Sequence, residues 1–320
     1  MKTDTSTSAS SRTYTVSAER PRALAREYFE LTKPRVVALI VFTAIVGMFL
    51  SSPGLLPLGP FLFGTLGIAA AAGSAAAFNH VLDRSSDAVM ARTRARPLPT
   101  GQLTTRSALV FAVLLGVLSM VLLFAGANAL TAGLTFASLI GYSVIYTVYL
   151  KHATPQNIVI GGAAGAFPPM IGEAAVSGTV SLETFILFAI IFLWTPPHFW
   201  ALALVKSADY ARAGIPMLPN VAGPAATRRQ ILLYTLVLAP VGVVPVTAGF
   251  AGLAYAVVSV LGGLAMLALA LKVYRVREGE PAMRAAQQLF GFSILYLFLL
   301  FAALLAEHGL GLLRPLGLPA

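Results

Sequence analysis

Three side chains with oxygen donors recur at a four-residue spacing near the end of a long apolar stretch. They are Asn79, Asp83 and Asp87, and on a helix residues at i, i+4 and i+8 share one face, with neighbouring Cβ atoms about 6 Å apart. Carboxylate and amide oxygens are hard ligands, and Mg²⁺ commonly combines one or two carboxylates with water and substrate phosphates. The spacing therefore predicts a magnesium site, whereas the alternative is the solvated end of a helix.

An arginine-rich segment follows these carboxylates closely. Residues 92–99 read Arg-Thr-Arg-Ala-Arg-Pro-Leu-Pro, and a guanidinium group can donate two parallel hydrogen bonds to phosphate oxygens. Metal-binding carboxylates beside Arg92 and Arg96 predict a diphosphate site. Asp209, in a later polar segment, is a candidate ligand of a second Mg²⁺, although a single aspartate in a loop is commonly just solvated.

The composition shows what kind of scaffold must hold these residues. Of the 320 residues, 58% are hydrophobic and 11% are charged, and the mean hydropathy is +0.82. Soluble domains carry about a quarter charged residues, so the composition predicts an all-α, polytopic membrane bundle and excludes a soluble or disordered chain. Cysteine is absent, which excludes disulfides, thiolate metal sites and catalytic thiols.

Nine apolar stretches approach the roughly 20 residues that a helix needs to cross a bilayer, and we expect them to surround a central cavity. They are residues 36–56, 60–79, 107–126, 128–150, 157–177, 183–205, 230–249, 251–271 and 288–306. Of the 22 lysines and arginines, 21 fall on one side of this topology, which the positive-inside rule makes cytoplasmic together with the N-terminus, leaving the C-terminus outside.

The topology also predicts how the chain is divided and where it resides. We expect a disordered cytoplasmic tail over residues 1–35, the bundle over 36–306 and a short external tail over 307–320. The net charge of +10 then mainly orients the protein in its bilayer and needs no nucleic acid as a partner. A cell (inner) membrane location is favoured over the mitochondrial inner membrane, with the polar loops on the cytoplasmic face, where we look for chemistry.

Several segments of the chain resemble motifs of one enzyme superfamily, the intramembrane UbiA-type prenyltransferases. The first aspartate-rich motif of that superfamily is matched by residues 79–87 and 92–99. Within the superfamily, the protoheme IX farnesyltransferases (haem O synthases) are resembled at residues 154–162, 194–203 and 209–219. The chain departs from many members at the second motif, where Asp209 stands instead of several aspartates, and this leaves open whether one or two Mg²⁺ bind.

The resemblance implies that farnesyl diphosphate, haem b and water react to give haem O and diphosphate, with Mg²⁺ as cofactor. It implies catalytic roles for Asp83, Asp87 and Lys151, with Asn79, Arg92, Arg96 and Lys151 on the diphosphate. A downstream haem O-processing enzyme is a possible partner. Two other functions stay open: prenyl transfer to 4-hydroxybenzoate in quinone synthesis, and transport, although transporters usually place polar groups near the midplane.

Aromatic and histidine side chains inside the expected spans are further candidates for this reaction. Tyr142, Tyr146 and Tyr149 are spaced i, i+4, i+7, and their ring faces could stabilise an allylic carbocation, with Tyr149 as the catalytic candidate nearest Lys151; an aromatic belt or packing is the alternative. His198 follows two prolines within a span. An intramembrane histidine is a functional candidate by default, here for contact with haem, unless it is simply hydrogen-bonded within the bundle.

Overall fold

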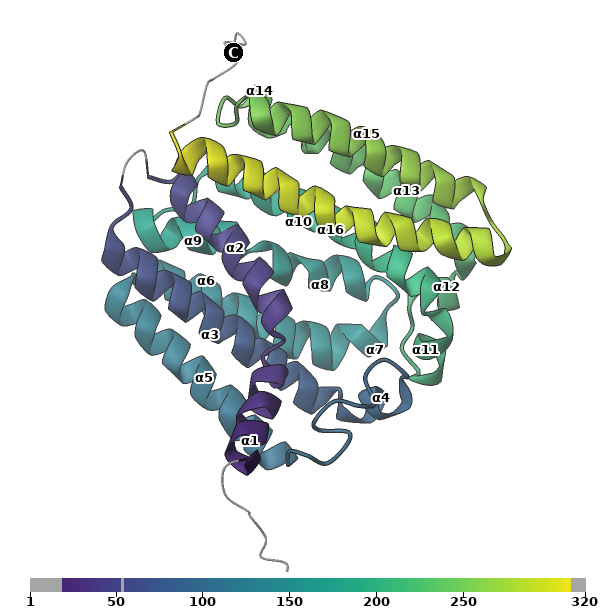
Figure 1. The fold of residues 1–320 in the computed structure, drawn as a ribbon, viewed down its shortest axis with the longest axis horizontal. Coiled ribbons are helices and arrows are strands. Elements are labelled where there is room, and N and C mark those ends of the chain that lie inside the picture. Colours follow the sequence, from purple (N-terminus) through teal and green to yellow (C-terminus); the bar gives the residue numbers. More distant parts are fainter. Residues whose placement is uncertain (1–18, 53–54, 312–320) are drawn as a thin grey trace, which may run out of the picture.

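The computed structural model describes residues 19–52 and 55–311, and every regular element within these residues is a helix (Figure 1). In chain order the elements are α1 (Glu19–Leu31), α2 (Pro34–Leu50), α3 (Leu58–Leu82), α4 (Arg84–Val89), α5 (Thr105–Gly126), α6 (Ala129–Ile140), the π-helix η1 (Gly141–Leu150), α7 (Lys151–Ala153), α8 (Asn157–Ala166), α9 (Pro168–Ser177), α10 (Leu182–Val205), α11 (Ser207–Arg212), α12 (Leu218–Val221), α13 (Gly223–Val241), α14 (Val244–Thr247), α15 (Leu253–Arg275) and α16 (Gly279–Gly309). The all-α prediction is confirmed.

The predicted spans correspond to helices of membrane-crossing length. Eight helices or continuous helical segments of the described chain are long and apolar enough to cross a bilayer, and a ninth results if α1 and α2, bent by 51° at their junction, count as one span. On α5 large apolar side chains such as Leu114, Val121 and Phe124 are exposed. Such a surface is unfavourable in water and is expected where a helix faces lipid.

Small residues allow the spans to pack closely. Along the α3–α5 contact, the hydroxyl of Ser74 donates to the carbonyl of Ala112 at 2.7 Å, and the hydroxyl of Ser119 donates to the carbonyl of Gly67 at 2.7 Å. Between α2 and α9, a Cβ atom at Gly172 would overlap the backbone carbonyl of Ala44. Glycine is therefore required at that crossing, as at other close contacts between membrane helices.

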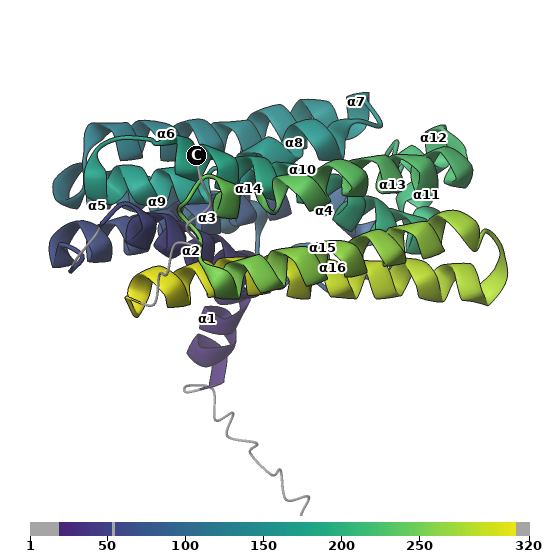
Figure 2. The same cartoon turned by 90° about the horizontal axis from the view of Figure 1, so that it is seen from above.

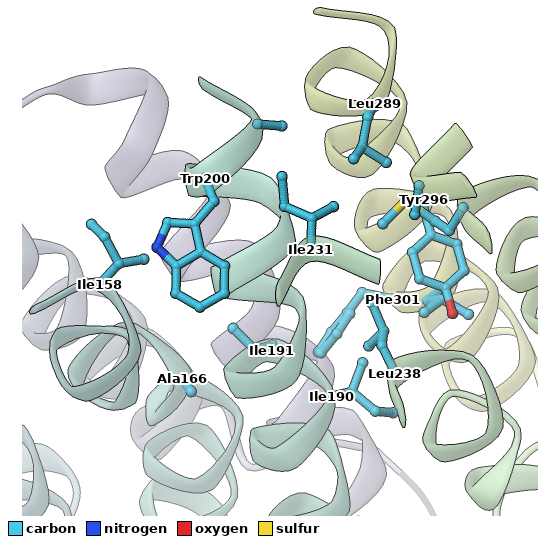
Figure 3. Close-up of a cluster of buried hydrophobic side chains, with 14 of the residues drawn as sticks. Ile158, Ala166, Ile190, Ile191, Trp200, Ile231, Leu238, Leu289, Tyr296 and Phe301 are labelled. Carbon is cyan, nitrogen blue, oxygen red and sulfur yellow. The ribbon is translucent and has the colours of Figure 1, made fainter. Parts of the chain in front are cut away.

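The largest apolar core joins α8, α10, α13, α15 and α16. Figure 3 shows Trp200 of α10 between Ile158 and Ile231, and all three belong to this cluster of buried side chains. Trp200 is fully buried and meets the ring of Tyr234 edge to face, with 5.4 Å between centroids. This core fixes α10, the helix that carries His198, against the last spans.

The boundaries of the two expected tails need correction. Residues 1–18 and 312–320 lie outside the described residues, but Glu19–Leu31 forms α1 instead of disordered chain. Its Leu31 is fully buried, and its Tyr28 packs on Phe111 of α5 at 5.0 Å between centroids, so apolar contacts order this helix. Glu307, placed at the start of the external tail, is a buried residue of α16 that accepts hydrogen bonds from the backbone N–H groups of Gly252 and Tyr255 at the start of α15.

Four short helices gather at one end of the bundle. Figures 1 and 2 both show α4 and α7 at the same end as α11 and α12, away from α14. The prolines within the spans act differently: the fifth span breaks between α8 and α9 at Phe167, just before Pro168, whereas α10 continues through Pro196 and Pro197. The fold thus brings the candidate polar residues to one end of an apolar bundle.

Candidate active site

The predicted stripe of oxygen donors forms at the junction of α3 and α4. Asp83 lies between the two helices, and backbone hydrogen bonds run from its N–H to the carbonyl of Asn79 at 2.9 Å and from the N–H of Asp87 to its own carbonyl at 2.7 Å. These i→i+4 bonds continue the helical register through the junction. Asn79, Asp83 and Asp87 therefore share one face, and these residues are 5%, 5% and 1% exposed.

The side-chain amide of Asn79 links Asp83 to Lys33. Its Nδ2 donates to Oδ2 of Asp83 at 2.7 Å and lies 3.5 Å from the hydroxyl of Thr147, while its Oδ1 accepts from Nζ of Lys33 at 2.5 Å. Each end of the amide thus has a partner of the right polarity, which fixes the side chain in place.

Each carboxylate is paired with a cation from a distant part of the chain. Nζ of Lys151 lies 2.5 Å from Oδ1 of Asp83, and Nη1 of Arg96 lies 2.6 Å from Oδ2 of Asp87. A buried carboxylate needs such a partner, because desolvation of an unpaired charge costs several kcal/mol. With Lys33, three basic side chains face two carboxylates, which is a group suited to a polyanion.

Hydrogen bonds to backbone carbonyls hold the segments that carry Lys151 and Arg96 in position. Lys151 is only 8% exposed, and its carbonyl accepts a hydrogen bond from Nδ2 of the buried Asn157 at 3.1 Å. In the loop that carries Arg96, the buried hydroxyl of Thr93 donates to the carbonyl of Asp87 at 3.0 Å. The predicted proximity of Lys151 and Arg96 to the carboxylates is thus present.

Arg92 and Asp209 lie in different surroundings from this group. Arg92 is exposed and makes no ion pair with the described residues, and Asp209 pairs with Arg212 of its own helix. Tyr210, which follows Asp209 in the chain, is partly buried. Burial raises the pKa of its hydroxyl, the charge of Arg92 acts to lower that pKa, and Asp209 acts to raise it. No hydrogen bond or ion pair within residues 19–52 and 55–311 joins Asp209 to Asp83 or Asp87.

An apolar cavity of about 490 Å³ extends from Lys33 into the bundle. Its volume lies in the range of small-molecule sites. Tyr142, Tyr146 and His198 line it among mostly aliphatic and aromatic side chains. The rings of Tyr142 and Tyr146 stack with 5.5 Å between centroids, so a charged end and an aromatic wall belong to one continuous space.

Tyr149 does not share that wall, and its catalytic role stays a prediction that its position does not support. Its side chain is 65% exposed, and it does not line the cavity. The cause is the π-helix η1, in which hydrogen bonds run from i to i+5 and each turn is wider. Seven residues make about two turns of an α-helix, but fall well short of two turns of a π-helix, so Tyr149 points elsewhere while Tyr142 and Tyr146 remain together.

Lys33 is a site residue that the sequence analysis did not identify. It lies 46 residues before Asn79, and its backbone is left-handed, with φ of 51°, the one positive φ outside glycine among the described residues. Such a backbone is strained for lysine and is found preferentially at functional sites. The only signal in the sequence was a basic residue directly before Pro34 at the start of a span.

The donor set fits Mg²⁺ by its chemistry. Asn79, Asp83 and Asp87 present amide and carboxylate oxygens, which Mg²⁺ prefers. Among the described residues no group of three or more His, Asp or Glu side chains converges, so a metal here would take further ligands from Asn79, water or a substrate phosphate.

Comparison with known proteins identifies the family of the chain. Residues 40–299 match the model of the UbiA prenyltransferase family. The chain is 60% identical over 290 residues to the protoheme IX farnesyltransferase of Methylobacterium nodulans, covering 91% of each chain. It is 54% identical over 283 residues to that of Nitrosococcus oceani, covering 88% of this chain and 93% of the relative.

Solved structures share the fold at low sequence identity. A digeranylgeranylglyceryl phosphate synthase superposes with a TM-score of 0.74 at 16% identity, covering 91% of this chain and 99% of that one. A UbiA homologue from Archaeoglobus fulgidus bound to DMAPP and Mg²⁺ superposes with a TM-score of 0.66 at 16% identity, covering 87% and 99%. By its sequence and its fold, the chain belongs to the UbiA prenyltransferase family, among the protoheme IX farnesyltransferases.

Proposed function

We propose that the protein transfers the farnesyl group of farnesyl diphosphate to a vinyl group of haem b, with addition of water, and so makes haem O and diphosphate. The observation that carries this proposal is the cationic group around Asp83 and Asp87, which meets an apolar cavity at Lys33. A prenyl diphosphate has the same division into an anionic head and an apolar chain. The relatives at 54% to 60% identity are protoheme IX farnesyltransferases, which supports haem b as the acceptor.

The cations of the site are suited to hold the diphosphate as it departs. Lys33, Lys151 and Arg96 now donate to Asn79, Asp83 and Asp87, and each can turn to a phosphate oxygen while a metal takes the protein oxygens. Mg²⁺ bound by Asn79, Asp83 and Asp87 would neutralise charge that develops on the leaving group. Fixed positive charge that faces developing negative charge is usually the largest contribution to such catalysis. Arg92, exposed beside Tyr210, would reach the diphosphate from solvent, and Asp209 remains a candidate for a second metal.

The cavity is suited to protect the allylic cation. Its apolar lining excludes water from the cationic carbon until the vinyl carbon attacks, and the stacked rings of Tyr142 and Tyr146 present π-electrons that attract a cation. These two residues replace Tyr149 in that role.

Membranes that contain the protein, incubated with farnesyl diphosphate and either haem b or 4-hydroxybenzoate, test the acceptor directly. We expect haem O with haem b and no product with the benzoate; product with the benzoate alone would refute the proposal. EDTA should stop diphosphate release and Mg²⁺ should restore it. Asp83→Ala and Asp87→Ala should abolish turnover at normal membrane content, and full haem O production in either variant would contradict the metal site.

The cytoplasmic orientation of the site is part of the proposal, and it rests on the 21 of 22 basic residues on that side. Because the chain has no cysteine, a single cysteine introduced at an exposed position shows on which side of the membrane that position lies. Arg94→Cys should react with a membrane-impermeant maleimide only after permeabilisation of intact cells, whereas Leu310→Cys should react without it. The reverse pattern would invert the topology. In a cell membrane of this orientation, haem O would pass to a haem O-processing enzyme.

A further inference from the structure

The imidazole ring of His198 forms a hydrogen bond with a serine of another span. Its Nδ1 lies 2.7 Å from the hydroxyl oxygen of Ser293 in α16, and that hydroxyl also lies 2.7 Å from the backbone carbonyl of Phe290. A carbonyl oxygen can only accept, so the single hydroxyl proton of Ser293 goes to Phe290. The hydroxyl oxygen must then accept from His198, which places a proton on Nδ1.

The aromatic neighbours fix the plane of the same ring. His198 stacks between Trp194, at 4.3 Å between centroids, and Phe290, at 4.6 Å. Ser293 anchors one side of this arrangement as well, because its carbonyl accepts the indole N–H of Trp194 at 2.7 Å. The tilt of the imidazole ring is thus set by Trp194 and Phe290, and its tautomer by Ser293, which lies outside the cavity lining.

The other ring nitrogen is left for a ligand. His198 lines the cavity, which Ser293 does not, and its Nε2 has no hydrogen-bond partner in residues 19–52 and 55–311. None of the side chains that line the cavity is acidic, so nothing there compensates the charge of an imidazolium. With the proton on Nδ1, the neutral ring offers an Nε2 lone pair and has no N–H to donate into the cavity.

We propose that Nε2 of His198 is an axial ligand of the haem iron in the substrate complex, and that Ser293 is the positioning residue that sets its tautomer. This inference rests on the proposed function, since it takes haem b as the acceptor. A histidine that binds a metal through one nitrogen almost always donates its other N–H to a neighbouring acceptor, which is the arrangement of His198 and Ser293. A propionate would instead need a donor, which this tautomer does not supply.

Binding of ferric haem and of metal-free protoporphyrin IX to the purified protein tests the iron contact. The wild-type complex with ferric haem should show the absorption and EPR signature of a nitrogen ligand. His198→Ala should lose that signature and bind ferric haem at least tenfold more weakly, added imidazole should restore it, and metal-free protoporphyrin IX should bind both proteins alike. A wild-type complex without a nitrogen ligand, or an equal loss of both porphyrins in His198→Ala, would overturn the proposal.

Substitutions of Ser293 separate positioning from packing. Ser293→Ala should weaken ferric haem binding by about tenfold to 100-fold and change the iron spectrum, whereas Ser293→Thr, which keeps a hydroxyl, should retain both. Ser259→Ala is the matched control, because Ser259 is fully buried and makes the same bond to the carbonyl three residues earlier, but has no histidine partner. An unchanged spectrum in folded Ser293→Ala would refute its role.

Haem O formation by the same wild-type preparation separates the two claims. If haem O forms while no nitrogen ligand is seen, the proposed function stands and the iron contact is wrong. If no haem O forms, the proposed function fails whatever the spectra show.

Discussion

The pairing of Asp83 with Lys151 makes a quantitative prediction about the stability of the site. Both residues are more than nine-tenths buried, and their charged atoms lie 2.5 Å apart. Removal of one partner from a buried ion pair leaves an uncompensated charge and costs about 3–5 kcal/mol. Asp83→Asn and Lys151→Met keep the shape of each side chain, so each single variant should lose about 3 kcal/mol of unfolding free energy.

The double variant distinguishes a direct pair from two independent effects. Without either charge, the desolvation penalty is absent on both sides, and the combined loss should fall short of the sum of about 6 kcal/mol by roughly 2–3 kcal/mol. We would measure the unfolding free energy of all four proteins by denaturant titration in detergent, with haem O formation measured in parallel. All three variants should be inactive, since the proposed function uses both groups to hold the diphosphate.

An exposed ion pair provides the control. Glu280 and Arg284 are paired on α16 with side chains 74% and 68% exposed, and such pairs contribute less than about 1 kcal/mol. The cycle of Glu280→Gln and Arg284→Met should therefore show little coupling and leave activity unchanged. If the Asp83–Lys151 cycle were additive to within about 0.5 kcal/mol, the pair would not be a direct interaction and the electrostatic account of the site would be wrong.

Three further substitutions, two of them with a matched control, test individual contacts. Lys33→Met removes a charge-assisted hydrogen bond worth about 1.5–3 kcal/mol, so kcat/KM for farnesyl diphosphate should fall roughly 10- to 150-fold; a change under threefold would count against Lys33. Tyr146→Leu should lower kcat by about 2- to 30-fold, given a cation–π energy of about 0.5–2 kcal/mol, whereas Tyr149→Leu should stay within about twofold of wild type; equal effects would contradict the positions of the two rings. Gly172→Ala should cost about 1–3 kcal/mol through overlap with the neighbouring backbone, while Gly133→Ala, with open space around it, should not lower the unfolding temperature.

Local patterns in the sequence were sufficient for the spans and for the first motif. Apolar stretches of about 20 residues predict membrane helices because a bilayer leaves no other way to satisfy the backbone, and the described helices match them. The spacing of Asn79, Asp83 and Asp87 predicts a shared face because the helix repeat is regular through Asp83. The expected shared face of Tyr142, Tyr146 and Tyr149 did not extend to Tyr149, because a π-helix replaces the expected α-helix and changes the number of residues per turn.

Contacts between distant parts of the chain could not be predicted in this way. The sequence by itself determined the class of protein, its spans and the oxygen donors of the site, because these depend on composition and on residues a few positions apart. Only the tertiary structure decided that Lys33 reaches Asn79 across 46 residues and that Ser293 meets His198 across 95. The physical reason is that helix packing sets such contacts through side-chain shape and close backbone approach. The hydrophobic periodicity of the sequence does not predict which helices will pack against each other.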